Sequence, residues 1–193
     1  NAAISACAAG RRPETALALL AEMQRLSGES NTTSSGGGDA HRKSRRRGRH
    51  RERAGEDDDD LAAPDVVTYN AVITACEKAG QWERAVALLD EMRTRADRPR
   101  PDVITYNAVV SACARCAQWE RAVELLDEMR AGSPATTPRP DRITYSSAIS
   151  ACARAGAAAE ALALLDEMVD AAASRCGNDV RMIAPDVITY NAA

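Results

Sequence analysis

The strongest constraint on the fold of this chain is an internal repeat. PDVITYNA occurs twice, from Pro101 and from Pro185, and near copies begin at Pro64 and Pro140. Aligned on their tyrosine, successive copies lie 37, 39 and 45 residues apart, yet the tyrosine and the methionine of the following LLDEM are always separated by 23 residues. Each unit therefore keeps a core of constant length, and only the connection after that methionine varies.

Each unit is predicted to be a pair of helices. In TYNAVITACEKAG, apolar residues recur from Tyr69 to Cys76 at the spacing of one helical face, and Gly80 ends the pattern. The following QWERAVALLDEM repeats this spacing from Trp82 to Met92 and predicts a second helix. We call these two segments helix A and helix B. Because one pair cannot bury its apolar faces alone, the pairs must stack, which predicts an all-α fold, an α-solenoid of antiparallel helix pairs.

The composition fits closely packed helices. Hydrophobic residues make up 45% of the chain, aromatic residues only 3%, and phenylalanine is absent. No apolar run approaches the roughly 18 residues that cross a bilayer, so we expect a soluble protein with no membrane partner. NAA at residue 1 and NAA at residue 191 are the same point of the repeat. We therefore expect the chain to be a piece of a longer solenoid.

The connection after the first unit differs in composition from the units. It holds NTTSSGGG, HRKSRRRGRHRER and EDDDD without apolar periodicity, so we expect it to be disordered. Its basic tract at 41–53 could fold onto RNA or act as an import-like patch, but such a run is more often a solvated loop. His41 and His50 in this tract are expected to be solvated rather than catalytic. The predicted organisation is a partial unit 1–23, the insertion 24–63, units 64–101, 102–140 and 141–184, the last with an extended loop, and the start of another unit at 185–193.

The repeated motifs resemble those of the pentatricopeptide repeat family. TYN, a Cys-x-x-Ala-Gly turn, Glu-Met at the end of helix B and Pro-Asp occur in this order several times, as in repeats of the P type. The tetratricopeptide repeat is the nearest rival, but its Trp, Leu-Gly and Tyr pattern is missing. The resemblance implies a right-handed superhelix that binds single-stranded RNA, one base per repeat, without enzymatic activity or a cofactor. It also implies a chloroplast or mitochondrial location and a role in RNA processing, stability or editing.

The resemblance assigns base-reading roles to the fifth and the last residue of each unit. The units beginning at Val66, Val103 and Arg142 then supply the pairs Asn70 with Asp102, Asn107 with Asp141, and Ser146 with Asp186. Asn1 with Asp65 completes the truncated first unit, and Asn191 begins a further one. The second residue of each unit would sandwich the bases, and these residues are Val67, Ile104, Ile143 and Ile188. One cation near the end of each helix A would contact phosphate, and these cations are Lys78, Arg115 and Arg154.

The chemistry of these residues suits an RNA base. An Asn amide presents a donor beside an acceptor, enough to bond the edge of a pyrimidine, and an Asp carboxylate can accept from the amide and fix its orientation. By the family's pairing rule, Asn with Asp favours uracil and Ser with Asp favours guanine, which predicts a U-rich ligand with one G, such as U-U-U-G. Taken singly, each Asp could equally be a helix N-cap.

Cysteine spacing offers one alternative chemistry. Cys113 and Cys116 have the spacing of half a zinc site. However, Cys7, Cys76, Cys113 and Cys152 occupy one position of helix A in successive units, on its apolar face. Packing of small apolar thiols therefore explains them better, and no metal site is predicted.

Two other functions remain open at this point. The stack could bind a peptide and serve as a protein-interaction scaffold, which is the main alternative to RNA binding. An enzyme domain could also follow the repeats in a longer chain. Net charge decides little, because outside 24–63 the chain has 16 Lys and Arg against 20 Asp and Glu. A local stripe of cations can attract phosphate despite an acidic total.

Overall fold

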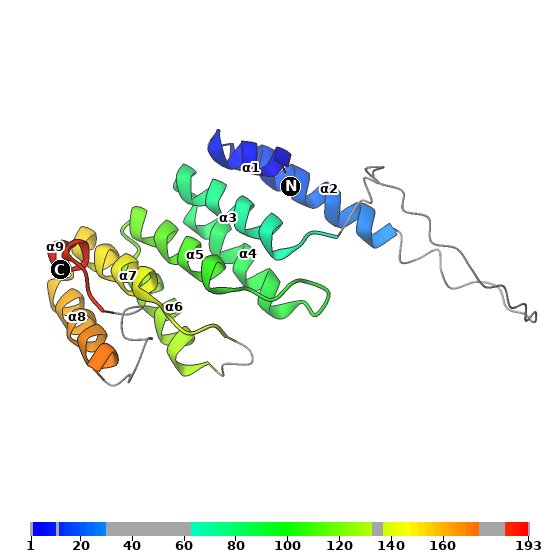
Figure 1. The fold of residues 1–193 in the computed structure, drawn as a ribbon. Coiled ribbons are helices and arrows are strands. Elements are labelled where there is room, and N and C mark those ends of the chain that lie inside the picture. The colour runs from blue at the N-terminus through cyan, green and yellow to red at the C-terminus, as the bar shows by residue number, and fades with distance from the viewer. Residues whose placement is uncertain (1, 11, 30–62, 133–136, 174–183, 193) are drawn as a thin grey trace, which may run out of the picture.

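The computed structural model describes residues 2–10, 12–29, 63–132, 137–173 and 184–192, and every regular element in these ranges is a helix. Figure 1 shows α1, α3, α5 and α7 in one row, each joined to the helix that follows it in the chain. The helices are α1 (Ala2–Ala9), α2 (Pro13–Glu29), α3 (Val66–Ala79), α4 (Trp82–Thr94), α5 (Val103–Arg115), α6 (Trp119–Ala131), α7 (Arg142–Ala155), α8 (Ala158–Ala173) and α9 (Val187–Ala192).

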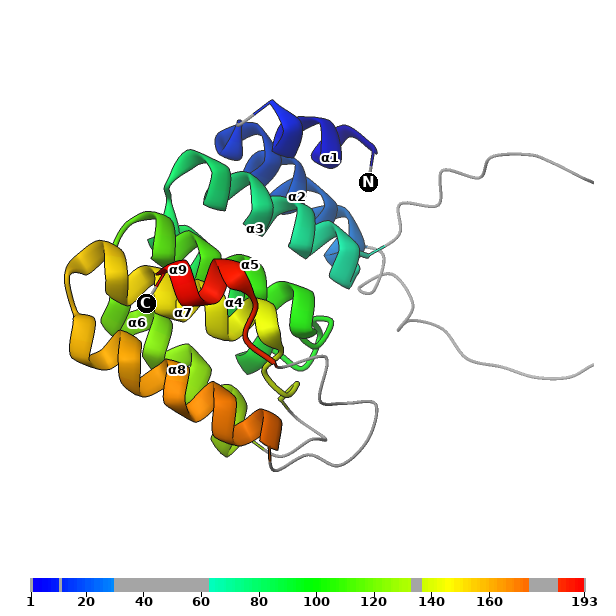
Figure 2. The same cartoon turned by 60° about the vertical axis from the view of Figure 1, so that its left-hand side comes forward.

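The helices form two layers. The A helices α1, α3, α5, α7 and α9 pack on one another in chain order, and each B helix packs on its own A helix and, for α2, α4 and α6, on the next one as well. Figure 2 shows the same stack from another side, with α1 and α2 at one end and α9 in front of α7, on which it packs. This arrangement confirms the predicted α-solenoid of stacked helix pairs. None of the described helices is long and apolar enough to cross a membrane.

The core of the stack comes from the positions that the periodicity identified. Tyr69, Tyr106 and Tyr145 are almost completely buried, as are the LLDEM methionines Met92, Met129 and Met168. Trp82 and Trp119 are half-buried and pack against this core, as expected for helix B. Ala75, Ala112 and Ala151 on the A helices are fully buried, and a side chain of one carbon needs little room between packed helices.

The turn between helix A and helix B requires a left-handed backbone. Gly80 and Gly156 end α3 and α7 with φ of 73° and 79°. Ala117 occupies the equivalent place after α5 with φ of 56°, in a region that residues with a Cβ rarely adopt. The stack therefore imposes this turn even where the sequence offers no glycine.

Helix α2 is longer than predicted. The insertion was expected to begin at Gln24, but the helix continues to Glu29. The Gln24 side chain reaches the next helix pair, where its amide donates to the Tyr69 hydroxyl at 2.9 Å and to Glu91 at 3.1 Å. These contacts across the joint explain why the helix persists beyond its apolar pattern. Residues 30–62 of the predicted insertion, including the tract 41–53 with His41 and His50, lie outside the described residues.

A polar cluster connects each helix pair to the next. The buried Tyr106 hydroxyl donates to Glu128 Oε1 at 2.6 Å, within one pair, and Arg93 of the preceding pair lies 2.8 Å from the same carboxylate. Tyrosine, glutamate and arginine thus tie the C-terminal end of one B helix to the core of the next pair. The following joint repeats the cluster with Tyr145, Glu167 and Arg130.

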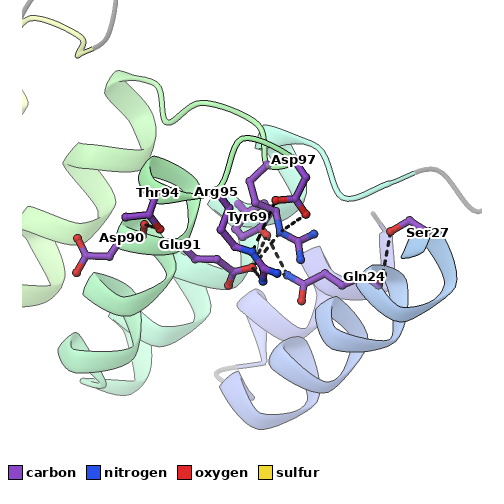
Figure 3. Close-up of polar contacts among 9 residues, drawn as sticks. Gln24, Ser27, Tyr69, Asp90, Glu91, Thr94, Arg95 and Asp97 are labelled. Atoms are coloured by element: carbon purple, nitrogen blue, oxygen red, sulfur yellow. Dashed lines mark hydrogen bonds and ion pairs between the residues drawn. The ribbon is translucent and has the colours of Figure 1, made fainter. Parts of the chain in front are cut away.

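The first joint has glutamine where the later joints have arginine. Figure 3 shows Gln24 from α2 meeting Tyr69 of α3 and Glu91 of α4. Arg98 compensates, because its Nε lies 3.1 Å from Glu91 Oε1 in an ion pair. Burial, reinforced by the Glu91 charge, raises the pKa of Tyr69 to about 12, so this tyrosine stays protonated and can donate to the carboxylate. Each joint thus positions the A helices that carry the candidate site.

Candidate nucleic-acid interface

Each Asp of a Pro-Asp pair begins a helix A. Asp65, Asp102 and Asp141 have extended backbones and accept the N–H of the residue three positions later at 2.7, 2.8 and 2.9 Å. Asp186 does the same at the start of α9, at 2.9 Å. The capping interpretation of these aspartates is therefore confirmed.

Two of these carboxylates, those of Asp102 and Asp141, also meet the predicted amides of the preceding helix pair. Asn70 Nδ2 donates to Asp102 Oδ1 at 3.2 Å. Asn107 Nδ2 lies 3.1 Å from both carboxylate oxygens of Asp141. Because a carboxylate has no proton to donate at neutral pH, the atom facing it must be the amide nitrogen. Capping and contact with the amide are thus two roles of one side chain, rather than alternatives.

A third residue joins each amide and was missed in the sequence. Thr105 Oγ1 donates to Asn70 Oδ1 at 2.6 Å, and Thr144 Oγ1 donates to Asn107 Oδ1 at 2.6 Å. Both threonines are fully buried. Their signal was visible, because Thr precedes the tyrosine in all four copies of the repeat, but helical periodicity alone gives this position no partner.

Ser146 behaves differently from the two asparagines. Its hydroxyl donates to the Ile143 carbonyl oxygen within its own helix at 3.1 Å, instead of reaching the next pair. Asp186 lies 3.7 Å from an Arg142 nitrogen. Within the described residues, the third predicted pair therefore lacks the bond that joins the first two. Asn191 is exposed on α9, whereas Asn1 lies outside the described residues.

An exposed apolar side chain accompanies each site on the same helix. Val67, Ile104 and Ile143 are 61%, 64% and 54% exposed, more than almost any other large apolar residue in the described ranges. Each lies three residues before an Asn or Ser of the predicted pairs. The same position of helix A therefore leaves an apolar side chain in water once per unit. The side chain of Ile188 lies outside the described part of the chain.

The predicted phosphate contacts occupy the last turns of their helices. Lys78, Arg115 and Arg154 are exposed at the ends of α3, α5 and α7. No ion pair holds any of the three within the described ranges, in contrast to the arginines of the B helices. Positive charge at a helix C-terminus also stabilises the helix itself, so this placement has a structural benefit independent of any ligand.

The cysteines support the packing interpretation. Cys76, Cys113 and Cys152 are fully buried on the A helices, and Cys116 is half-buried at the end of α5. Burial raises the pKa of the Cys113 thiol to about 11. Within the described residues, no three His, Cys, Asp or Glu side chains gather into a group that could hold a metal ion.

We expect iodoacetamide to alkylate Cys116 much faster than Cys113. A thiol with a pKa near 11 has about 100-fold less thiolate at pH 8 than one at the usual value, and the packed core excludes the reagent as well. Peptide mass spectrometry should find Cys116 alkylated and Cys113 unmodified in the folded protein, with both modified in urea. Equal labelling of the two in the folded protein would contradict the packing interpretation.

Comparisons with known proteins identify the repeats. A model of the PPR repeat family matches residues 64–99, and models of the PPR repeat match residues 98–130, 138–169 and 1–27. No curated protein sequence matches the chain. Among solved structures, the chain resembles pentatricopeptide repeat protein PPR10 in complex with an 18-nt psaJ RNA element, with 38% identity and a TM-score of 0.52.

A second structure of the same protein, PPR10 from maize, gives 27% identity and a TM-score of 0.53. These matches cover 66% and 67% of this chain but only 16% of the PPR10 chain, so the present chain spans about one sixth of that relative. The family models, by contrast, together cover most of the residues outside the long insertion. The chain belongs to the pentatricopeptide repeat family.

Proposed function

We propose that this chain is a sequence-selective scaffold for single-stranded RNA that reads one base per unit on the exposed face of its A helices. The observation that carries the proposal is the bond between an amide and a carboxylate across each of two successive joints, Asn70 to Asp102 and Asn107 to Asp141. The bond orients the amide while leaving its second N–H and one lone pair for a base. The RNA complex of the PPR10 relative supports the same ligand class.

The neighbouring apolar residues supply the base-stacking surface in this proposal. Val67, Ile104 and Ile143 are exposed at intervals of one unit, so a base inserted between two successive units would meet an aliphatic side chain on each face. Ile188 occupies the same position in α9. Aliphatic contact should contribute less than the roughly 1–3 kcal/mol that aromatic stacking gives per base. Tight binding would therefore need several units in series.

Lys78, Arg115 and Arg154 complete the proposed site by meeting the RNA backbone. They are free of ion pairs in the described part of the chain and follow the order of the units along the stack. Their field would act locally even though the repeats carry more acidic than basic residues. The proposed ligand is U-rich, with G opposite Ser146 and Asp186, and runs with its 5′ end toward the protein's N-terminus.

In the cell, we infer a non-enzymatic role for the scaffold. By shielding or positioning a transcript it would act in RNA processing, stability or editing in a chloroplast or mitochondrion, and other proteins could join it there. The proposal predicts binding to single strands rather than to duplexes, because the edges of paired bases are already occupied.

Substitution of the two amides tests base reading. The double variant Asn70→Thr, Asn107→Thr should change the preferred ligand from oligouridylate to an oligomer with guanine at two successive positions, by the family's pairing rule. Filter binding with U-rich, G-containing, A-rich and duplex RNA measures the preference, and far-UV circular dichroism verifies that helicity is retained. An unchanged RNA preference in the folded variant would contradict the proposal. Binding of a peptide in place of RNA would favour the protein-interaction alternative.

A further inference from the structure

The hydroxyl groups of Thr105 and Thr144 lie where the amide of one helix pair meets the first turn of the next. Each is fully buried and lies 2.6 Å from the Oδ1 atom of the asparagine in the preceding pair. Each also accepts the N–H of its own N-cap aspartate at 3.1 Å. The hydroxyl oxygen is therefore an acceptor within its own helix, and its single proton is available to a second group.

Two acceptors compete for that proton. Asn70 Oδ1 lies 2.6 Å from Thr105 Oγ1, and Asp102 Oδ1 lies 2.8 Å away. The carboxylate oxygen already accepts the Thr105 backbone N–H and Asn70 Nδ2, whereas no other donor within the described residues reaches Asn70 Oδ1. Asn70 Oδ1 is the nearer of the two acceptors, and it would otherwise have no donor within the described residues. We therefore expect the Thr105 hydroxyl to donate its proton to the amide oxygen.

The combined contacts fix the polarity of the amide. The carboxylate must face the amide nitrogen, because two oxygens without a proton repel each other. The threonine hydroxyl then faces the amide oxygen and donates to it. A flipped amide would lose both bonds and place Oδ1 against the carboxylate. The hydroxyl thus binds the oxygen of the planar amide and the carboxylate binds its nitrogen. The second N–H and the second lone pair of the amide are left available in a fixed order.

The structure contains an internal comparison. Thr189 occupies the same position in α9 and donates to Asp186 Oδ1 at 2.9 Å, as a capping residue does. The preceding pair carries Ser146 in place of asparagine, and its hydroxyl is bonded to the Ile143 carbonyl oxygen. Thr189 therefore has the local capping contact but no amide to hold. The contact with the amide is separable from the capping role.

We propose that Thr105 and Thr144 are positioning residues for base selection, each holding the amide of the preceding unit so that it reads uracil rather than cytosine. The proposal rests on the proposed RNA-reading function. Uracil presents a carbonyl oxygen beside an N–H, and cytosine presents an amino group beside an unprotonated nitrogen, so the two bases need the amide's donor and acceptor in opposite order. A complete reading site then has three protein groups, an amide from one unit and a carboxylate and a hydroxyl from the next.

The test removes the hydroxyl without changing the volume of the side chain. In the double variant Thr105→Val, Thr144→Val, the ratio of affinities for oligouridylate and oligocytidylate should fall by roughly 3- to 10-fold per site, the effect of one neutral hydrogen bond. Serine at both positions should restore the ratio. Thr189→Val is the matched control, because it removes the equivalent hydroxyl beside an N-cap aspartate where that hydroxyl holds no amide, and it should leave the ratio unchanged.

A second readout needs no RNA. In ¹H–¹⁵N spectra, Thr105→Val should shift the side-chain amide signals of Asn70 alone, and Thr144→Val those of Asn107 alone, with signals assigned by their loss in the Asn→Ala variants. Unshifted amide signals, or an affinity ratio that falls no further than in Thr189→Val, would overturn the inference. A wild-type protein without any preference for uridine would instead refute the proposed function, while the spectra would still decide whether threonine holds the amide.

Discussion

Replacement of Tyr106 by alanine is expected to lower the free energy of unfolding by about 3–5 kcal/mol, the range for removing a large aromatic side chain from a packed core. Tyr106 is 1% exposed, and its hydroxyl bonds to Glu128 at 2.6 Å. The variant loses both the ring and the donor that links α5 to α6, and it leaves the carboxylate with Arg93 alone. Urea denaturation followed by circular dichroism measures the change.

Two further variants serve as comparisons, one for the hydroxyl group and one for burial. Tyr106→Phe keeps the ring and should cost about 1.5–3 kcal/mol, because the lost hydrogen bond has a charged acceptor. Tyr190→Ala is the exposed control, since that equivalent tyrosine is 57% exposed, and it should change stability by less than about 0.5 kcal/mol. Similar losses in Tyr106→Ala and Tyr190→Ala would contradict the assignment of the joint.

The hydroxyl also predicts a loss of stability in alkali. Burial, together with the bond to Glu128, raises the pKa of Tyr106 above its usual value near 10. Its contribution to stability is therefore complete below about pH 10 and is lost as the pH rises further, because the unfolded chain ionises first. Tyr106→Phe should lose less stability between pH 9 and 11 than the wild type.

Neutralising the three exposed cations of the A helices should have the largest effect on RNA binding. Changing Lys78, Arg115 and Arg154 to alanine would remove the three proposed phosphate contacts, so the dependence of log affinity on log salt should become shallower by about 2. The same relation gives about a 100-fold loss of affinity for a single strand at 0.1 M salt. Binding titrations with oligouridylate at several salt concentrations provide both values.

The B helices supply a control with the same change in net charge. Arg25, Arg84 and Arg121 are partly exposed and form ion pairs in the outer layer. Such surface pairs contribute about 0–1 kcal/mol each, so alanine at all three positions should leave the fold intact. The salt dependence of this control should match that of the wild type. If both triple variants lose affinity equally, RNA responds to total charge, and the proposed path along the A helices is wrong.

Local periodicity predicted the helices well because each helix satisfies its apolar pattern within its own length. The turn at Gly80 and the start at Asp65 follow from residues with strong conformational preferences. Local preferences do not predict the conformation of Ala117. Packing of the stack holds this alanine in the left-handed conformation that glycine adopts in the equivalent turns. Helix α2 likewise extends past its apolar pattern, where Gln24 bonds to Tyr69 and Glu91 of the next pair.

The candidate site was predictable only in part. The family's pairing rule predicted that Asn70 pairs with Asp102 and Asn107 with Asp141, and both pairs are in contact. The partner of Thr105 lies 35 residues away in the sequence, and the partner of Arg93 is likewise in another unit. Contacts between units depend on how closely the A helices approach, which periodicity along one helix does not specify. Ser146 departs from the pattern because its hydroxyl bonds to a carbonyl oxygen of its own helix.

The bond between Asn70 and Asp102 also determines how specificity could be moved between proteins. A segment cut before each Pro-Asp would transplant Asn70 without Asp102 and Thr105, so the recipient would supply the carboxylate and hydroxyl that orient it. A segment covering 69–105 would carry all three groups of that site together. The transferable cassette for one base is therefore shifted by about one helical turn from the helix pair that forms the packing unit.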